Sequence, residues 1–112
     1  MRIAIPLTEG KLALHLNRCQ EFALIDVDPN TGIVQGRRWA AAPSPGRGVV
    51  PEWLAGLGAQ MVIAGHLGRR EQSRFAEQGI RTLVDAPAAT AGQLVAAYVA
   101  GSLRTREGLG NA

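Results

Sequence analysis

The sequence has little of what several protein classes require. A single cysteine, Cys19, rules out a disulfide within the chain. Aromatic residues make up only 4% of the sequence, too few for the stacking surfaces that bind nucleic acid. The longest apolar runs, such as 61–64 and 94–97, are far shorter than the roughly 20 residues of a membrane helix. The sequence opens without signal-peptide regions, so we expect a cytoplasmic protein. The low aromatic content and the short apolar runs predict no nucleic-acid or membrane partner.

The composition is that of a globular protein. Of the 112 residues, 46% are hydrophobic and 19% are charged, which suits one domain with a buried core. We predict a single domain over residues 1–103 and a flexible C-terminal tail over residues 104–112. The net charge of +3 is carried mostly by arginine and favours an anionic partner without specifying which one.

The apolar pattern predicts an α/β domain. Short runs rich in β-branched residues predict strands at 2–5, 22–27, 33–39, 61–64 and 81–84. Apolar residues at helical spacing predict helices at 50–57, 69–78 and 90–101. Thr90 and Gln93 form a capping-box pattern that opens the last helix. The order β-β-β-α-β-α-β-α predicts a three-layer domain with a five-stranded mixed sheet and helices on both faces.

The predicted topology nominates a site at one end of this sheet. If the first, fourth and fifth strands run parallel through right-handed crossovers, the third strand runs the same way as the first, and the segments that follow the first, third and fourth strands open at one end of the sheet. These segments are the long loop at 7–21, the Pro-rich connection at 40–48 and the turn at 65–68. Open α/β sheets place ligands at such an edge. We therefore expect His15 and His66 to meet there.

Several motifs occur in an order that is typical of one family. Residues 14–19 read L-H-L-N-R-C and resemble an H-F-G-R-C signature, and the opening M-R-I-A-I-P resembles the strand that precedes it. The turn at 65–68 resembles a G-G-x-G turn with His66 in place of its second glycine. Further similarities are Phe75, Gly79, Ile80, Thr90, Ala91, Gly92 and Tyr98. Over residues 1–103 the chain resembles the dinitrogenase iron-molybdenum cofactor biosynthesis family.

This resemblance implies a ribonuclease H-like fold and a protein that binds or carries the iron-molybdenum cofactor or an iron-sulfur cluster precursor. His15 matches the motif histidine, Arg18 the motif arginine and Cys19 the variable position beside it. The implied partners are a metal cluster and the proteins that donate or accept it in nitrogen fixation. Since one cysteine cannot supply the roughly four thiolates of an ordinary iron-sulfur cluster, a cluster is held loosely or is shared within a homodimer.

Three residues are candidate metal ligands, namely His15, His66 and Cys19. Imidazole nitrogen and thiolate both suit iron and its clusters. Each residue also has an ordinary structural interpretation: His15 as a loop histidine bonded to a carbonyl, His66 as a surface turn residue, and Cys19 as a small buried hydrophobe. The sequence leaves both interpretations open.

Four residues are candidates for holding the anionic cofactor, namely Arg18, Gly65, Gly68 and Arg69. The turn at 65–68 offers backbone N–H groups at the start of a helix, where anions bind readily. A small phosphorylated ligand at this turn, or a protein-interaction role, are the alternatives to cluster binding. No carboxylate cluster, G-x-S-x-G elbow or Walker pattern is present, so we expect no enzymatic activity.

Overall fold

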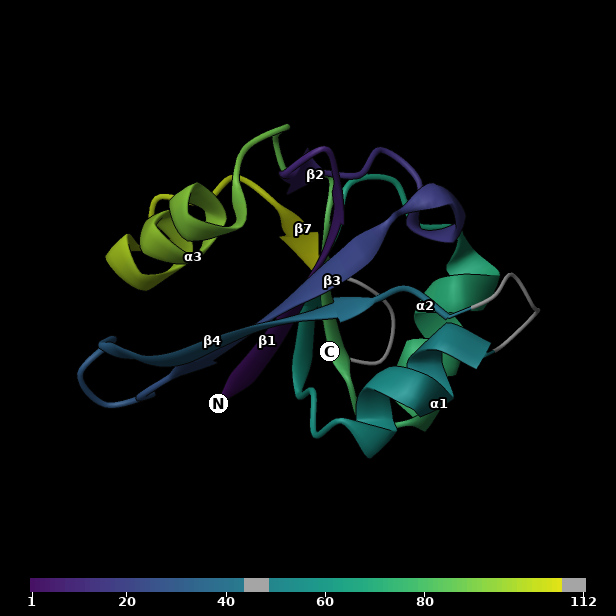
Figure 1. The fold of residues 1–112 in the computed structure, drawn as a ribbon, viewed down its shortest axis with the longest axis horizontal. Coiled ribbons are helices and arrows are strands. Elements are labelled where there is room, and N and C mark those ends of the chain that lie inside the picture. The colour runs from purple at the N-terminus through teal and green to yellow at the C-terminus, as the bar shows by residue number, and fades with distance from the viewer. Residues whose placement is uncertain (44–48, 108–112) are drawn as a thin grey trace.

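The computed structural model describes residues 1–43 and 49–107 (Figure 1). The described strands are β1 (Arg2–Thr8), β2 (Lys11–Leu12), β3 (Glu21–Val27), β4 (Val34–Ala41), β5 (Met61–Ile63), β6 (Arg81–Val84) and β7 (Arg106–Glu107). The described helices are α1 (Val49–Gly56), α2 (Arg69–Glu77) and α3 (Ala91–Ala100), together with the 3₁₀ turn η1 (Leu16–Arg18). The predicted order of strands and helices is confirmed for the eight longer elements.

The strands form one mixed sheet in the order β4-β3-β1-β5-β6-β7, and β2 pairs with β1. The central pairs β1–β5 and β5–β6 are parallel, and the other pairs are antiparallel. The prediction of five strands is wrong, because the described sheet has seven. The additional strands, β2 and β7, have two residues each, so their sequences carry no alternating pattern, and only the neighbouring strand defines them.

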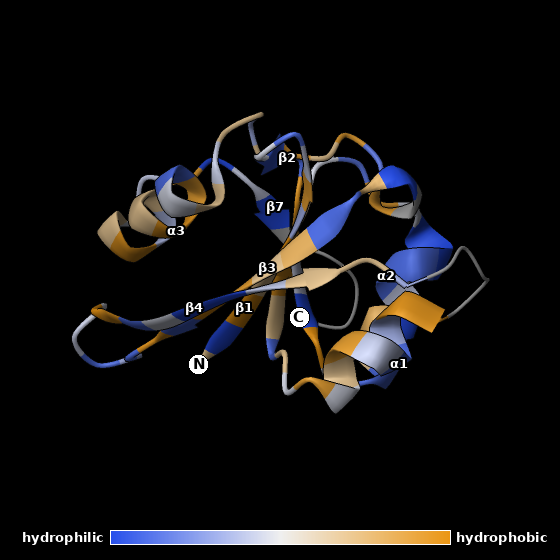
Figure 2. Ribbon diagram, viewed as in Figure 1, coloured by the Kyte–Doolittle hydropathy of each residue, from blue (hydrophilic) through white to orange (hydrophobic). Residues whose placement is uncertain are grey.

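Helices cover both faces of the sheet, as predicted (Figure 1). Alternate residues of β1 face opposite sides: Ile3 and Ile5 pack in a cluster with Leu94 of α3, whereas Ala4 packs with Leu54 of α1 and Phe75 of α2. The central strands are therefore apolar on both faces and appear orange along much of their length in Figure 2. The core therefore consists of two apolar layers, one on each side of the sheet.

The helix ends follow the predicted residue signals. The Thr90 hydroxyl accepts a hydrogen bond from the Gln93 amide, while the Gln93 side chain accepts one from the Thr90 amide, which completes the capping box. Gly101 ends α3 at φ 75°, and Gly79 follows α2 at φ 73°. Both glycines adopt the left-handed conformation that disfavours a side chain.

Part of the segment predicted as a tail is paired with the sheet. Residues Arg106 and Glu107 lie antiparallel to β6, and Arg106 Nε is 3.0 Å from Asp85 Oδ2. Residues 108–112 lie outside the described part of the chain, as do residues 44–48 of the predicted Pro-rich connection. Across residues 1–43 and 49–107, no helix has the length and apolar character needed to cross a membrane.

Candidate metal-binding site

The loop that follows β1 positions His15. Backbone hydrogen bonds attach this loop to β1 and to the connection before α3: the Ala13 amide donates to the Pro6 carbonyl (2.9 Å) and the Leu12 amide donates to the Ala89 carbonyl (2.8 Å). The next side chain after the histidine, Leu16, is 5% exposed and packs in the cluster beneath α1 and α2. His15 itself is exposed. A buried anchor beside it therefore fixes the backbone while the imidazole faces solvent.

The turn that follows β5 positions His66 in the same way. The Asp85 amide donates to the Gly65 carbonyl (2.8 Å), and the buried Leu67 side chain packs in the same cluster as Leu16. The side-chain amide of Gln72, a residue that is 5% exposed, donates to the Leu67 carbonyl at 2.7 Å. This bond ties the turn to α2. His66 is exposed between these fixed points.

The loop and the turn are in direct contact. The His66 amide donates to the Leu14 carbonyl at 3.1 Å, and His15 and His66 form an isolated parallel bridge. Their imidazole centroids are 5.7 Å apart with the ring planes at 82°. The expectation that the two histidines meet at one edge of the sheet is confirmed. The pair joins positions that are far apart in the sequence.

This separation is compatible with two ligands of one metal centre. Metal–nitrogen bonds of about 2.0 to 2.1 Å place two imidazole centroids on one metal roughly 5 to 6 Å apart. The rings now lie edge to face, and exposed side chains rotate on the picosecond to nanosecond timescale, so both nitrogens can turn outward. The pair can thus offer two nitrogen donors to a metal centre bound at the surface.

Cys19 has a different environment from the histidines. Its side chain is half-buried and packs against the apolar cluster beneath α1 and α2. Burial raises the pKa of the Cys19 thiol from 9.0 to about 11, so the thiol is protonated at neutral pH. Among the residues that the structure describes, no three His, Cys, Asp or Glu side chains are grouped so that they could hold one metal ion. The donors that geometry brings together are the two imidazoles.

The residues predicted to hold an anion lie on the two segments that carry the histidines. Arg18 ends η1 and is exposed, and Arg69 is the exposed first residue of α2. Gly68 is the N-cap of α2 and provides no side-chain cap. Gly65 has a backbone role, because a Cβ there would lie 3.2 Å from the carbonyl oxygens of Ala13 and Leu14.

Sequence reasoning missed two residues that shape this edge. Gln72 lies three residues before Phe75, on the buried side of α2, and that helical spacing is the signal that could have found it. Asp85 adopts a left-handed conformation at φ 62°, which is uncommon outside glycine, and its amide bonds the Gly65 carbonyl. An aspartate after a buried strand does not by itself predict this backbone conformation or the hydrogen bond to Gly65.

Comparison with known proteins identifies the family. The family model described as dinitrogenase iron-molybdenum cofactor matches residues 1–101. The chain belongs to this family. The two histidines, both arginines and Cys19 all lie within the matched residues. The comparison with curated proteins gives no match.

Solved structures share the fold of this dinitrogenase iron-molybdenum cofactor family member. The protein PH0822 is similar with a TM-score of 0.85 and 23% identity, covering 94% of each chain. The apo form of the orange protein from Desulfovibrio gigas is similar with a TM-score of 0.72 and 23% identity, covering 96% of this chain and 93% of that one. A protein from Methanocaldococcus jannaschii has a TM-score of 0.74 and 14% identity, covering 95% and 94%. The ribonuclease H likeness stays a prediction.

Proposed function

We propose that this chain is a non-catalytic accessory protein that binds and carries an iron-molybdenum or iron-sulfur type cluster. Membership of the dinitrogenase iron-molybdenum cofactor family supports a role linked to such clusters. The observation that carries the proposal for the site is the exposed imidazole pair, His15 and His66, with ring centroids 5.7 Å apart. Because the fold already holds the two backbone segments together, binding a cluster does not have to pay the entropy cost of bringing the two histidines together.

The available ligands suit a cluster that is bound transiently better than one that is bound permanently. An ordinary iron-sulfur cluster takes about four thiolates, whereas this chain has one cysteine, whose burial favours the neutral thiol. Two exposed imidazoles hold a preformed cluster by a small part of its surface and leave the rest open to a donor or acceptor protein. Cys19 could join only after its side chain leaves the apolar cluster.

Positive charge supports the same proposal. The net charge of the chain is +3, and Arg18 and Arg69 each follow one of the histidines by three residues. The first turn of α2 adds backbone N–H groups, which attract negative charge. A cluster with net negative charge is therefore attracted to the edge where the imidazoles bind it. These groups are also those that the alternative, a small phosphorylated ligand, would use.

Anaerobic reconstitution tests the proposal. The purified chain is incubated with ferrous iron, sulfide and molybdate, desalted, and examined for visible charge-transfer absorption and bound metal. We expect uptake by the wild type and loss of at least about nine-tenths of it in His15→Ala and in His66→Ala, since each leaves one donor. Leu14→Ala is the matched control, because Leu14 is exposed beside His15 and offers no donor.

The outcomes separate the two candidate ligands. Equal metal uptake by His15→Ala, His66→Ala and the wild type would overturn the imidazole site. Titration with inorganic phosphate, followed by NMR of the backbone amides at residues 68–70, then reports on the anion alternative. Shifts there, with no visible chromophore in any variant, would establish an anion-binding module instead.

A further inference from the structure

The edge strand β4 is a second feature of the molecule that could bind a partner. It is the terminal strand of the sheet, pairs only with β3 among the described strands, and is eight residues long. A strand of this length at a sheet edge presents a row of unpaired backbone groups that can template another strand. This lateral edge is separate from the end of the sheet where His15 and His66 meet, so the metal-binding proposal does not involve it.

The hydrogen-bond pattern identifies which groups are open. The Val27 amide bonds Met1 on the β1 side, so the odd residues of β3 pair with β1 and its even residues pair with β4. In the β3–β4 register, Leu24 is opposite Arg38 and Phe22 is opposite Ala40. The backbone groups of residues 38 and 40 are therefore used within the sheet. Those of residues 37 and 39 point to the open edge.

The side chains of these two residues lie on one face. Arg37 is opposite Ile25, and Trp39 is opposite Ala23, and both partners belong to the core layer covered by α3. Trp39 is 53% exposed, and Arg37 is exposed with no ion pair described. The face that adjoins the open backbone groups thus carries one cation and one large apolar side chain.

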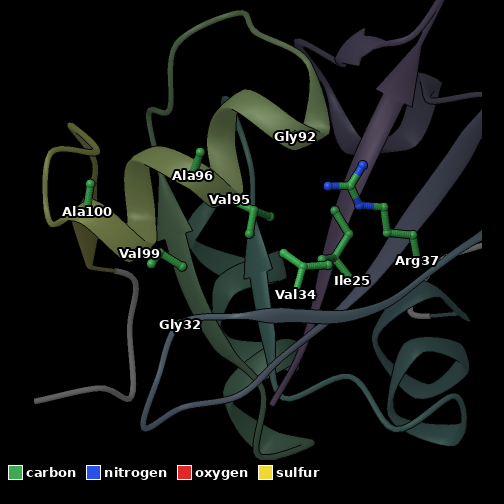
Figure 3. A pocket seen from close by; sticks show the side chains of 9 residues that line it. All are labelled: Ile25, Gly32, Val34, Arg37, Gly92, Val95, Ala96, Val99 and Ala100. Carbon is green, nitrogen blue, oxygen red and sulfur yellow. The ribbon is translucent and has the colours of Figure 1, made fainter.

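A groove lies on the same face, between β4 and α3 (Figure 3). Its volume is about 320 Å³. Val34 and Ile25 point into it from the sheet, and Val95 and Val99 point into it from α3. Among the described residues that line it, Arg37 is the only charged one. The groove is therefore an apolar slot with a single positive charge.

We propose that β4 is the docking site for an extended segment of another protein, which adds to the sheet as a strand. The segment carries an acidic residue that pairs with Arg37 and a neighbouring apolar residue, on the same face, that enters the groove. In such strand addition, backbone bonds supply affinity and pockets for alternate side chains supply specificity. We expect the docking segment to be acidic because it lies beside Arg37 and because the net charge of the chain is +3.

A second copy of this chain fits the edge less well. Antiparallel pairing of two β4 strands centred on residue 37 sets Arg37 opposite Arg37, and centring on residue 38 sets Arg38 opposite Arg38. Like charges directly opposite each other destabilise a strand pair. An acidic segment instead converts the same positions into favourable cross-strand pairs. In these two registers, charge complementarity therefore favours a different chain as the occupant.

A designed peptide tests the proposal. The probe is a fluorescein-labelled hexapeptide, Leu-Thr-Glu-Thr-Leu-Thr, with blocked ends, whose leucines and glutamate share one face; its binding is measured by fluorescence anisotropy. We expect Arg37→Glu to weaken binding by about tenfold or more, since attraction becomes repulsion. Arg38→Glu is the matched control: it makes the same charge change on the opposite face and should leave binding within about twofold.

Hydrogen exchange tests the backbone part. Peptide binding should slow exchange of the amides of residues 37 and 39, while those of residues 38 and 40 are already protected. A peptide N-methylated on the bonding edge should not bind. Absence of peptide binding, equal weakening by Arg37→Glu and Arg38→Glu, or undiminished binding of the N-methylated peptide would each overturn the proposal. A dimer in sedimentation that Trp39→Pro dissociates would instead assign the edge to a second copy, because proline removes an amide that points to the open edge.

Discussion

Gly65 and Leu14 lie so close that a side chain on the glycine would be crowded: a Cβ built on Gly65 would be 3.2 Å from the Leu14 carbonyl oxygen. The same distance separates it from the Ala13 oxygen. This close approach lets the two segments run side by side, and the amide of the next residue bonds Leu14 at 3.1 Å. The close approach of the two segments that carry the histidines therefore favours glycine at position 65.

We therefore predict that Gly65→Ala separates the two segments. The added carbon would crowd both carbonyl oxygens, so the loop must shift by a few tenths of an ångström. Overpacking of this kind costs about 1 to 3 kcal/mol of the free energy of unfolding. Metal uptake should fall with it, because the imidazoles move apart. Chemical denaturation and the reconstitution assay measure the two effects. Gly56→Ala is the control, since no atom lies within 4 Å of a Cβ there, and it should keep full metal uptake.

The Cys19 thiol should react slowly in the folded protein. Burial raises its pKa from 9.0 to about 11, and only the thiolate is a strong nucleophile. At about pH 8 the thiolate fraction is then roughly a hundredfold lower than for a cysteine without this shift. Alkylation with iodoacetamide, followed by mass spectrometry, should accelerate as the pH rises toward 11. The same chain unfolded in urea should react at the ordinary rate; equal rates in both states would contradict the prediction.

The ion pair between Arg2 and Asp26 should make stability depend on pH. The Arg2 guanidinium donates to Asp26 at 2.7 and 3.1 Å, and this bonding lowers the pKa of the carboxyl below 3.8. A lowered carboxyl pKa adds stability at neutral pH, and the gain disappears as the pH falls through the folded-state value. Since both side chains are about one-third exposed, we expect Asp26→Asn to cost only about 0.5 to 1 kcal/mol at pH 7.

Urea denaturation of wild type and Asp26→Asn at neutral pH and at about pH 2 measures this difference. The gap between the two proteins should shrink at the lower pH. The variant Arg2→Gln provides the other side of a double-mutant cycle. A gap that is the same at both pH values would mean that Asp26 acts through packing and not through its charge.

Much of this architecture is predictable because its signals are local or topological. The capping box of Thr90 and Gln93 is contained in four residues, and the alternation of Ile3, Ala4 and Ile5 suits a strand that is buried on both faces. The meeting of His15 and His66 follows from parallel strands that end at one edge of the sheet. None of these inferences requires atomic distances.

The features that escaped prediction depend on contacts between distant segments. Strands β2 and β7 are defined by the neighbours that they pair with, and their own sequences, Lys-Leu and Arg-Glu, are not strand-like. The burial of Gln72 depends on the position of the Leu67 carbonyl, which the sequence does not specify. Sequence patterns describe faces and spacings, but not which polar group will find a partner.

The two imidazoles belong to segments that an unfolded chain would hold apart, so their joint affinity for a guest exists only while the domain is intact. The binding of any metal centre by both rings is thermodynamically linked to folding. At a free ligand concentration one hundred times the dissociation constant, binding raises the free energy of unfolding by about 2.7 kcal/mol. Loaded protein should consequently resist heat and proteolysis better than empty protein. Delivery of the guest would return the domain to its less stable form.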